Sequence, residues 1–382
     1  MMFYDANRRG SRIAARILIA LLIVAGGIGI AGRGQISSGE LADIRTVIES
    51  AKSTRATAAA SMDFAQGTMH ANDFQSAITS TRQAVADYDQ LAASASLTRF
   101  TSDSPFAQFV FTPRTTLLGT VDRLNNAANT MQTQTAALID AMETSFANDF
   151  RTDGGHWMVQ VDDPAAINEL VSRYGKQRSY QTLQEHLDDL KSLYNLEQRV
   201  RQQVADSIAS LHTEETNAAQ IAVPTEAGAL DAAGWLGTAQ SVASTLGVQV
   251  KQTSVYGCPG ADDNGDDNAD MVIGFFCGGS QASRNEVNML TTHPEWPAVE
   301  SSPLLVDYTK HELAHRSIMI VCGTTEPEIA ANRTEAVTNS YAVQFLGASR
   351  ERIAGSQQGL AAYAMDAQSD QIAQSIHNGT CA

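Results

Sequence analysis

The sequence predicts an α+β protein in three parts: an N-terminal transmembrane or signal-anchor helix, an all-α helical bundle and a small C-terminal α+β domain. The first observation is an uncharged apolar run that follows a group of arginines near the N-terminus. The second is long helical periodicity through the middle of the chain, and the third is a pair of short apolar segments between helices in the last third. A chain of 382 residues has room for two or three such units.

The N-terminus predicts a membrane anchor, with a basic cytoplasmic segment at 1–16 and a spanning segment at 17–33. The arginines that set this orientation are Arg8, Arg9, Arg12 and Arg16. Small residues near Ala31 also allow a cleaved signal peptide, which would make the protein secreted. In both cases the rest of the chain is expected outside the cytoplasm. The net charge of −16 argues against a nucleic-acid partner, whose phosphates require a basic surface.

Residues 40–215 are predicted to form an antiparallel helical bundle that acts as a stalk, spacer or partner-binding module. Apolar residues recur at spacings of three and four over several turns, most clearly at Leu117, Val121, Leu124, Ala128, Met131, Leu138 and Met142. Loops are expected at Gly67, Pro105 and Pro113 and at 153–155. The scattered histidines His70, His156, His186 and His212 are interpreted as surface or packing residues, and the polar run 198–202 as a solvated face.

The C-terminal domain is predicted at 225–382, after a linker that begins near Pro224. A helix is expected at about 230–246, followed by strands at 248–255 and 271–276. The segment between the strands is rich in side-chain oxygens, and Asp262, Asn264 and Asp266 resemble the opening of an EF-hand calcium loop. Asp267 stands where that loop has glycine and no glutamate closes it, so the sequence favours an acidic hairpin over Ca²⁺.

All four cysteines lie in the last third of the chain, which suits a domain outside the cytoplasm. Four cysteines allow three pairings. The favoured one joins Cys258 to Cys277 across a short loop and Cys322 to Cys381, which would hold the C-terminal tail. A structural zinc cluster is disfavoured because no CxxC spacing is present.

The segment His311-Glu312-Leu313-Ala314-His315 carries the predicted chemistry. On a helix, residues four apart lie on one face, so both imidazoles can bind one metal ion with Glu312 beside it. The flanking residues support a helix, since Ser302-Pro303 suits its start and apolar residues recur at helical spacing. A catalytic zinc site uses three protein ligands and leaves the fourth position for water. Glu335, on a second helix ended by Gly347, is the candidate third ligand.

These residues resemble the gluzincins, the thermolysin-like clan of zinc metallopeptidases, in which HExxH is followed by a glutamate ligand on its own helix. The resemblance implies a zincin-like domain, and an acidic residue one turn after the glutamate that supports a histidine ligand. Asn339 stands at that position here. The resemblance also implies that a sheet-edge strand, here 271–276, binds the main chain of the substrate. A last helix is expected at about 357–376.

The predicted function is therefore hydrolysis of peptide bonds in a peptide or protein substrate outside the cytoplasmic membrane, with zinc and the general base Glu312 activating water. His293, Tyr341, Tyr363 and His377 are available to stabilise the oxyanion, and spacing does not choose among them. One alternative is a membrane-anchored scaffold protein with a structural or inactive zinc site, although such a site needs no base between its histidines. Another is a zinc hydrolase that acts on a non-peptide bond of the cell envelope.

Overall fold

The computed structural model describes residues 38–94, 114–161, 164–176, 178–224, 234–258, 272–278 and 281–382. The anchor predicted at 17–33, the loop signals at Pro105 and Pro113, and the calcium-type loop at Asp262, Asn264 and Asp266 lie outside these residues. In the part of the chain that is described, no helix has the length and apolar character needed to cross a membrane. The described fold is mostly helical with a small sheet, which confirms the predicted α+β class.

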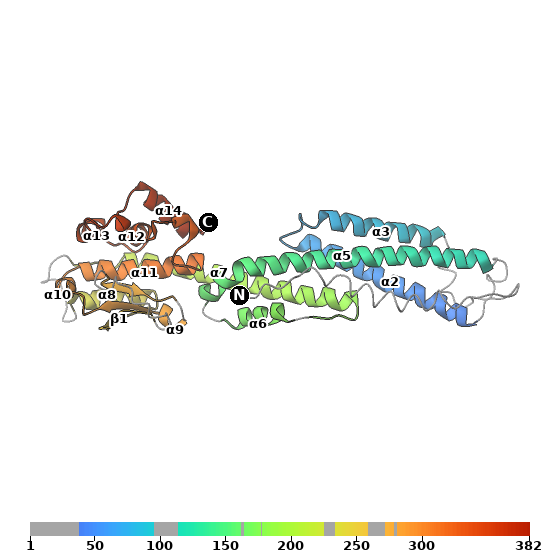
Figure 1. The fold of residues 1–382 in the computed structure, drawn as a ribbon, viewed down its shortest axis with the longest axis horizontal. Helices are drawn as coiled ribbons and strands as arrows, with labels where there is room; N and C mark the ends of the chain where they lie inside the picture. The colour runs from blue at the N-terminus through green and yellow to red at the C-terminus, as the bar shows by residue number, and fades with distance from the viewer. Residues whose placement is uncertain are drawn as a thin grey trace. The chain divides into compact units, whose positions relative to one another are not determined.

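The chain divides into two compact units (Figure 1). Unit 1 comprises residues up to 149 together with 174–195, and unit 2 comprises 150–173 and 196–382. Unit 1 contains helices α2 (Ser38–Gly67) and α3 (Gln75–Ser94). The long helices α5 (Arg114–Gln160) and α7 (Leu183–Ala219) contribute residues to both units.

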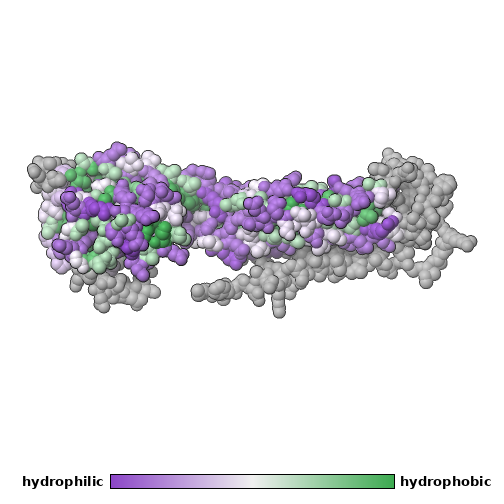
Figure 2. All heavy atoms as spheres, turned by 90° about the horizontal axis from the view of Figure 1, so that it is seen from above, coloured by the Kyte–Doolittle hydropathy of each residue, from purple (hydrophilic) through white to green (hydrophobic). Residues whose placement is uncertain are grey.

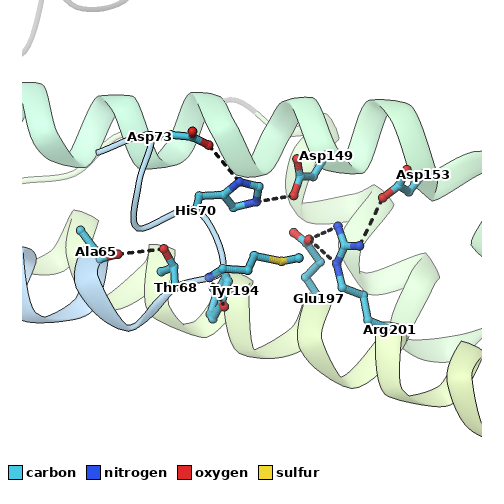
Figure 3. Close-up of polar contacts among 10 residues, drawn as sticks. Ala65, Thr68, His70, Asp73, Asp149, Asp153, Tyr194, Glu197 and Arg201 are labelled. Atoms are coloured by element: carbon cyan, nitrogen blue, oxygen red, sulfur yellow. Dashed lines mark hydrogen bonds and ion pairs between the residues drawn. The ribbon is translucent and has the colours of Figure 1, made fainter. Parts of the chain in front are cut away.

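The predicted apolar stripes form the core of unit 1. Helix α5 contributes Leu124, Met131, Leu138 and Met142, all of which are buried, and these pack with buried residues of α2, α3 and α7. The central aromatic residue is Phe146, which contacts Phe64, Phe74 and Tyr194. Helix α2 ends at Gly67, as predicted. Beside this core, His70 contacts Asp73 at 3.3 Å and Asp149 at 2.6 Å, which satisfies both ring nitrogens (Figure 3).

The loop predicted at 153–155 is wrong, because α5 continues through it to Gln160. The ring of Phe150 lies directly over Gly154, where a Cβ atom would approach it to 2.7 Å. This packing offsets the usual cost of about 1 kcal/mol for glycine inside a helix. Arg201 is also not on a solvated face, since within unit 2 it pairs with Glu197 and Asp153 (Figure 3) and lies over Trp157.

Unit 2 is layered around one central helix, α11 (Leu304–Cys322) (Figure 1). On one side lie α8 (Gly234–Thr245) and the sheet, and on the other lies α12 (Thr334–Phe345) with α13 (Arg350–Ser356) and α14 (Ala367–His377). Short helices α6 (Ala165–Gly175), α9 (Gln281–Arg284) and α10 (Trp296–Glu300) complete the unit, with 3₁₀ turns η5 (Glu328–Ala330) and η6 (Ala361–Tyr363). Helix α11 begins one residue later than predicted, with Pro303 at its N-cap.

The described part of the sheet has three strands in the order β1-β3-β2. Both predicted strands are present, as β1 (Gln249–Thr253) and β2 (Gly274–Phe276). The central strand β3 (Glu286–Leu290) was not predicted. It pairs with β1 in parallel, with Val250 opposite Val287, and with β2 in antiparallel fashion, with Phe275 opposite Asn288. Strand β2 is therefore an outer strand of the described sheet, next to α11.

The last helix predicted at 357–376 is wrong in its first half. Gly359 has a φ of +96°, a left-handed conformation that favours glycine and interrupts the helix. Helix α14 starts only after Asp366, whose side chain accepts from the backbone N–H of Ser369 while the Ser369 hydroxyl bonds the Asp366 backbone. This reciprocal capping box sets the start of α14.

Both predicted disulfides are present. Cys258 is joined to Cys277, directly after β2, and Cys322, the last residue of α11, is joined to Cys381 in the C-terminal tail. The predicted stop at Gly347 is also confirmed, because this residue follows α12 with a φ of +69°. On the face drawn in Figure 2, hydrophilic residues predominate on the described surface and hydrophobic ones occur in small groups.

Candidate metal centre

Helix α11 is buried on nearly all sides, including its polar residues. Leu305, Leu313 and Ile318 form the apolar contacts that the sequence predicted, and each is at most 1% exposed. His311 and Glu312 are also buried, at 5% and 6% exposure. Buried polar groups are costly unless other groups satisfy them, so the surroundings of this helix determine what its motif can do.

The structure brings His311, His315 and Glu335 together at one point between α11 and α12. The Nε2 atom of His311 lies 3.1 Å from Oε2 of Glu335, and Nε2 of His315 lies 3.4 Å from the same oxygen. A tetrahedral zinc ion with bonds of about 2.05 Å holds its ligand atoms about 3.3 Å apart. These two distances and the set of two imidazoles and one carboxylate fit a zinc ion with three protein ligands, provided that the imidazoles lose their protons when the metal binds.

Two residues of α12 orient the histidine rings from behind. Nδ1 of His311 donates to Oδ1 of Asn339 at 2.7 Å, which leaves Nε2 of the same ring directed at Glu335. The hydroxyl of Thr338 lies 3.4 Å from Nδ1 of His315. Such hydrogen bonds fix the orientation of a metal-binding imidazole and raise its basicity. Asn339 thus occupies the supporting position that the resemblance implied.

Glu312 lies beside the three ligand atoms but is not one of them. Burial raises the pKa of the Glu312 carboxyl above its ordinary value, while His311, His315 and a hydrogen bond from the Phe276 backbone act in the opposite direction. Gly274 of β2 makes room for this side chain, since a Cβ atom there would lie 3.0 Å from both Cγ and Oε1 of Glu312. The carboxyl is thus held between α11 and the outer strand, and its raised pKa makes it a stronger base than an ordinary glutamate.

The ligand atoms are also strongly coupled electrostatically. Burial alone would lower the pKa of His311, but its hydrogen bond with Glu335 and the charge of Glu312 raise it to about 9. Burial opposes ionisation of Glu335, yet hydrogen bonds with His311 and His315 hold the pKa of this carboxyl well below its usual range. These hydrogen bonds hold the Glu335 carboxylate against both imidazole nitrogens, and a metal ion that bound there would replace the imidazole protons.

A cleft of about 230 Å³ opens onto His311 and Glu312 and is lined by residues from both sides of unit 2. Its lining includes Gly274 of β2 and Tyr363 of η6 as well as His293. Of the four residues available as oxyanion donors, His293 and Tyr363 lie in this cleft. Tyr341 does not, because it is fully buried and donates to Glu215, and His377 also lies beside Glu215.

The described residues contain two further groups that sequence reasoning missed, Asp140 with Glu143 and His186, and His212 with Glu215 and His377. The signal that pointed to them was weak: Glu143 lies three residues after Asp140, and Glu215 three after His212, as expected on one helical face. The third member of each group comes from a distant part of the chain. Comparison with protein-family models, with curated proteins and with solved structures finds no match to this chain.

Proposed function

We propose that the protein is a zinc-dependent metallopeptidase of the gluzincin type, with His311, His315 and Glu335 as the zinc ligands. The proposal rests on one observation: the nitrogens of His311 and His315 lie 3.1 and 3.4 Å from one oxygen of Glu335, and the buried carboxyl of Glu312 lines the open cleft beside them. We further propose that this unit works outside the cytoplasmic membrane, since it contains two disulfides.

The chain's own groups then have distinct roles. Bound zinc would polarise the scissile carbonyl and acidify the attacking water. Glu312 takes the proton from that water and passes it to the leaving amine. The raised pKa of Glu312 favours the first transfer, because the carboxylate of a weaker acid is a better proton acceptor, and the leaving amine is basic enough to take the proton afterwards.

The cleft supports a peptide substrate. Among the described residues, strand β2 pairs with β3 along one side only, so we propose that its other edge offers main-chain groups to an extended chain. Tyr363 is the favoured oxyanion donor. Burial, together with the carboxylates of Glu335 and Glu312, raises the pKa of its phenol above the ordinary value, so the hydroxyl keeps its proton at neutral pH.

Glu312→Gln separates a peptidase from a scaffold. The substitution keeps the size of the side chain but removes its ability to take a proton, so zinc content and thermal midpoint should stay unchanged. Cleavage of an unstructured protein by the full chain in detergent should fall by at least ~100-fold. Glu326→Gln, the same change at an exposed glutamate of unit 2, is the control.

Each outcome of this test decides between the alternatives. Cleavage at the wild-type rate in the Glu312→Gln variant would refute the mechanism, and loss of zinc would make Glu312 a structural ligand. A wild-type protein that binds zinc but cleaves no polypeptide would favour the scaffold. If the wild type instead hydrolysed cell-envelope amides, and a chelator abolished that activity, the protein would be a zinc hydrolase of a non-peptide bond and not a peptidase.

A further inference from the structure

A second group of metal-binding side chains lies in unit 2 away from the cleft. His212 and Glu215 are three residues apart on one face of α7, and His377 is the last residue of α14. One ligand atom from each residue lies within 4.8 Å of the others. Nε2 of His377 is 3.3 Å from Oε2 of Glu215, which matches the separation of about 3.3 Å between ligands of a tetrahedral ion.

Two polar atoms of this group are buried without a hydrogen-bond partner among the described residues, Nε2 of His212 and Oε2 of Glu215. Glu215 is 1% exposed, so its carboxylate has almost no access to water. A buried, unsatisfied polar atom costs about 1–3 kcal/mol, and a charged one costs more. A divalent cation placed between these atoms would satisfy both at once.

The surroundings of the group hold its members close together. Tyr341 donates to Oε1 of Glu215 at 2.8 Å, which leaves Oε2 directed toward His377. The ring of His377 stacks between Phe345 and His212, with both centroid distances at 3.9 Å. A hydrogen-bonded carboxylate is a feature that supports a ligand in metal sites. One of the two stacked imidazoles must turn before both rings can direct a nitrogen at the same ion.

The group around His186 lacks these features. Nε2 of His186 lies 3.0 Å from Oε2 of Glu143, and Arg178 pairs with the other oxygen of Glu143 at 3.2 Å. The charges of that group are thus compensated by protein groups, so it has no need of an ion. The group around Glu215 has no Lys or Arg within ion-pair distance in the described residues.

We infer that His212, Glu215 and His377 bind a second divalent transition-metal ion of the Zn²⁺ class. Two imidazoles and one carboxylate suit Zn²⁺ rather than Ca²⁺ or Mg²⁺, which take mainly oxygen ligands. The ion would join α7 to α14 and, through Tyr341, brace α12, the helix that carries Glu335. Its role is to stabilise unit 2, separate from the cleft.

Zinc stoichiometry on the full chain in detergent tests this inference. After removal of metal with a chelator, the wild type should rebind two Zn²⁺ per chain and His311→Ala/His315→Ala should rebind one. Adding His377→Ala to that double variant should abolish the remaining ion. Glu215→Gln, which keeps the Tyr341 contact, should weaken it by at least ~10-fold. His70→Ala, a histidine flanked by carboxylates in unit 1, is the control and should leave zinc binding unchanged.

The outcomes for the two sites are distinguishable. A wild type with one Zn²⁺ that is lost in His311→Ala/His315→Ala would overturn this inference and leave the proposed function intact. A wild type with one Zn²⁺ that is lost only in Glu215→Gln or His377→Ala would support it and overturn the proposed function. A wild type that rebinds one Zn²⁺ instead of two already overturns one of the two sites, and the variants decide which one. Zinc should also raise the thermal midpoint of His311→Ala/His315→Ala, and an unchanged midpoint would contradict the stabilising role.

Discussion

Asn339→Asp is the most informative single change at the candidate metal centre, because it introduces the acidic residue that the gluzincin resemblance leads one to expect. The Asn339 side chain is fully buried and fully bonded. Its oxygen accepts from His311, and its amide nitrogen donates to Oε1 of Gln357 at 2.7 Å and to the Tyr363 carbonyl at 2.9 Å. A carboxylate could still accept from His311 but could not donate to the other two groups.

The magnitude follows from these three contacts. The hydrogen bond from His311 should strengthen with a charged acceptor, by about 1 kcal/mol. Gln357 can turn its amide over and donate to the new carboxylate, so that contact is kept. The backbone carbonyl of Tyr363 cannot turn, and two acceptors would then face each other in a buried site, at a cost of about 1–3 kcal/mol for the unsatisfied carbonyl and more for the repulsion. We expect a net loss of about 2 kcal/mol in the free energy of unfolding at pH 8.

The pH dependence gives this prediction its sign. Burial and the facing carbonyl raise the pKa of the new carboxyl in the folded state above its unfolded value of about 4. Between these two pKa values the carboxyl is therefore protonated in the folded state and ionised in the unfolded state. The variant should therefore be closest to wild type near pH 4 and lose stability as pH rises through the folded pKa. Urea unfolding at pH 5 and pH 8 measures this, with the exposed Asn332→Asp as control. A variant as stable as wild type at pH 8 would refute the reasoning.

Three further changes test other parts of unit 2. Gly274→Ala should lower the rate of peptide cleavage at least ~10-fold with zinc content unchanged, because the added methyl group displaces Glu312, whereas Gly355→Ala, with open space around it, should have no effect. Cys322→Ser/Cys381→Ser opens a loop of 59 residues and should lower the free energy of unfolding by about 4 kcal/mol, as measured by urea unfolding. An unchanged midpoint of urea unfolding would show that this disulfide does not stabilise the fold. Burial lowers the pKa of Lys310 from 10.5 to about 8, so between these pH values the folded state holds fewer protons than the unfolded state. The free energy of unfolding should therefore rise by about 3 kcal/mol as pH increases from 8 to 10.5. Urea unfolding at pH 7.5 and 10 measures this rise, which Lys310→Met should lack.

The local geometry of the candidate metal centre could be predicted from the sequence. The spacing of His311 and His315 requires only a helix to bring them together, and helical periodicity indicated that helix independently of the motif. Glu335 lies near the start of its own helix, as the resemblance implied. The cysteine pairing also followed from short sequence separation and position. These features depend on neighbours in the chain or on one well-defined motif.

Other features depend on contacts that no local pattern encodes. Strand β3 has only Val287 and Met289 as inward apolar residues before its end, and Glu286 and Asn288 disfavour a strand, so its central place comes from pairing on both sides. The alanine-rich stretch before Asp366 has high helix propensity, yet a capping box begins the helix later. That signal, an aspartate followed three residues later by serine, was available in the sequence.

The group around Glu215 was invisible for a different reason. His212 and His377 are far apart in the sequence, and each is ordinary in its own segment. Only the packing of α14 against α12, whose Tyr341 reaches Glu215 of α7, brings them together. A histidine judged alone is most often a packing residue, and the structure shows that His212 stacks on His377. What distinguishes it is the unsatisfied Nε2 atom, which is a property of the folded state.

The polar residues of α11 explain how the candidate centre can form before a metal arrives. Lys310 donates to the Gly347 carbonyl after α12, and Asp307 pairs with Arg352 of α13 and accepts from the Ser349 backbone. Each contact fixes a neighbouring helix against α11 without using the histidines. Helix packing therefore contributes to the spacing of the three candidate ligand atoms. Zinc affinity at this centre should accordingly depend on residues such as Asp307 that never touch the ion.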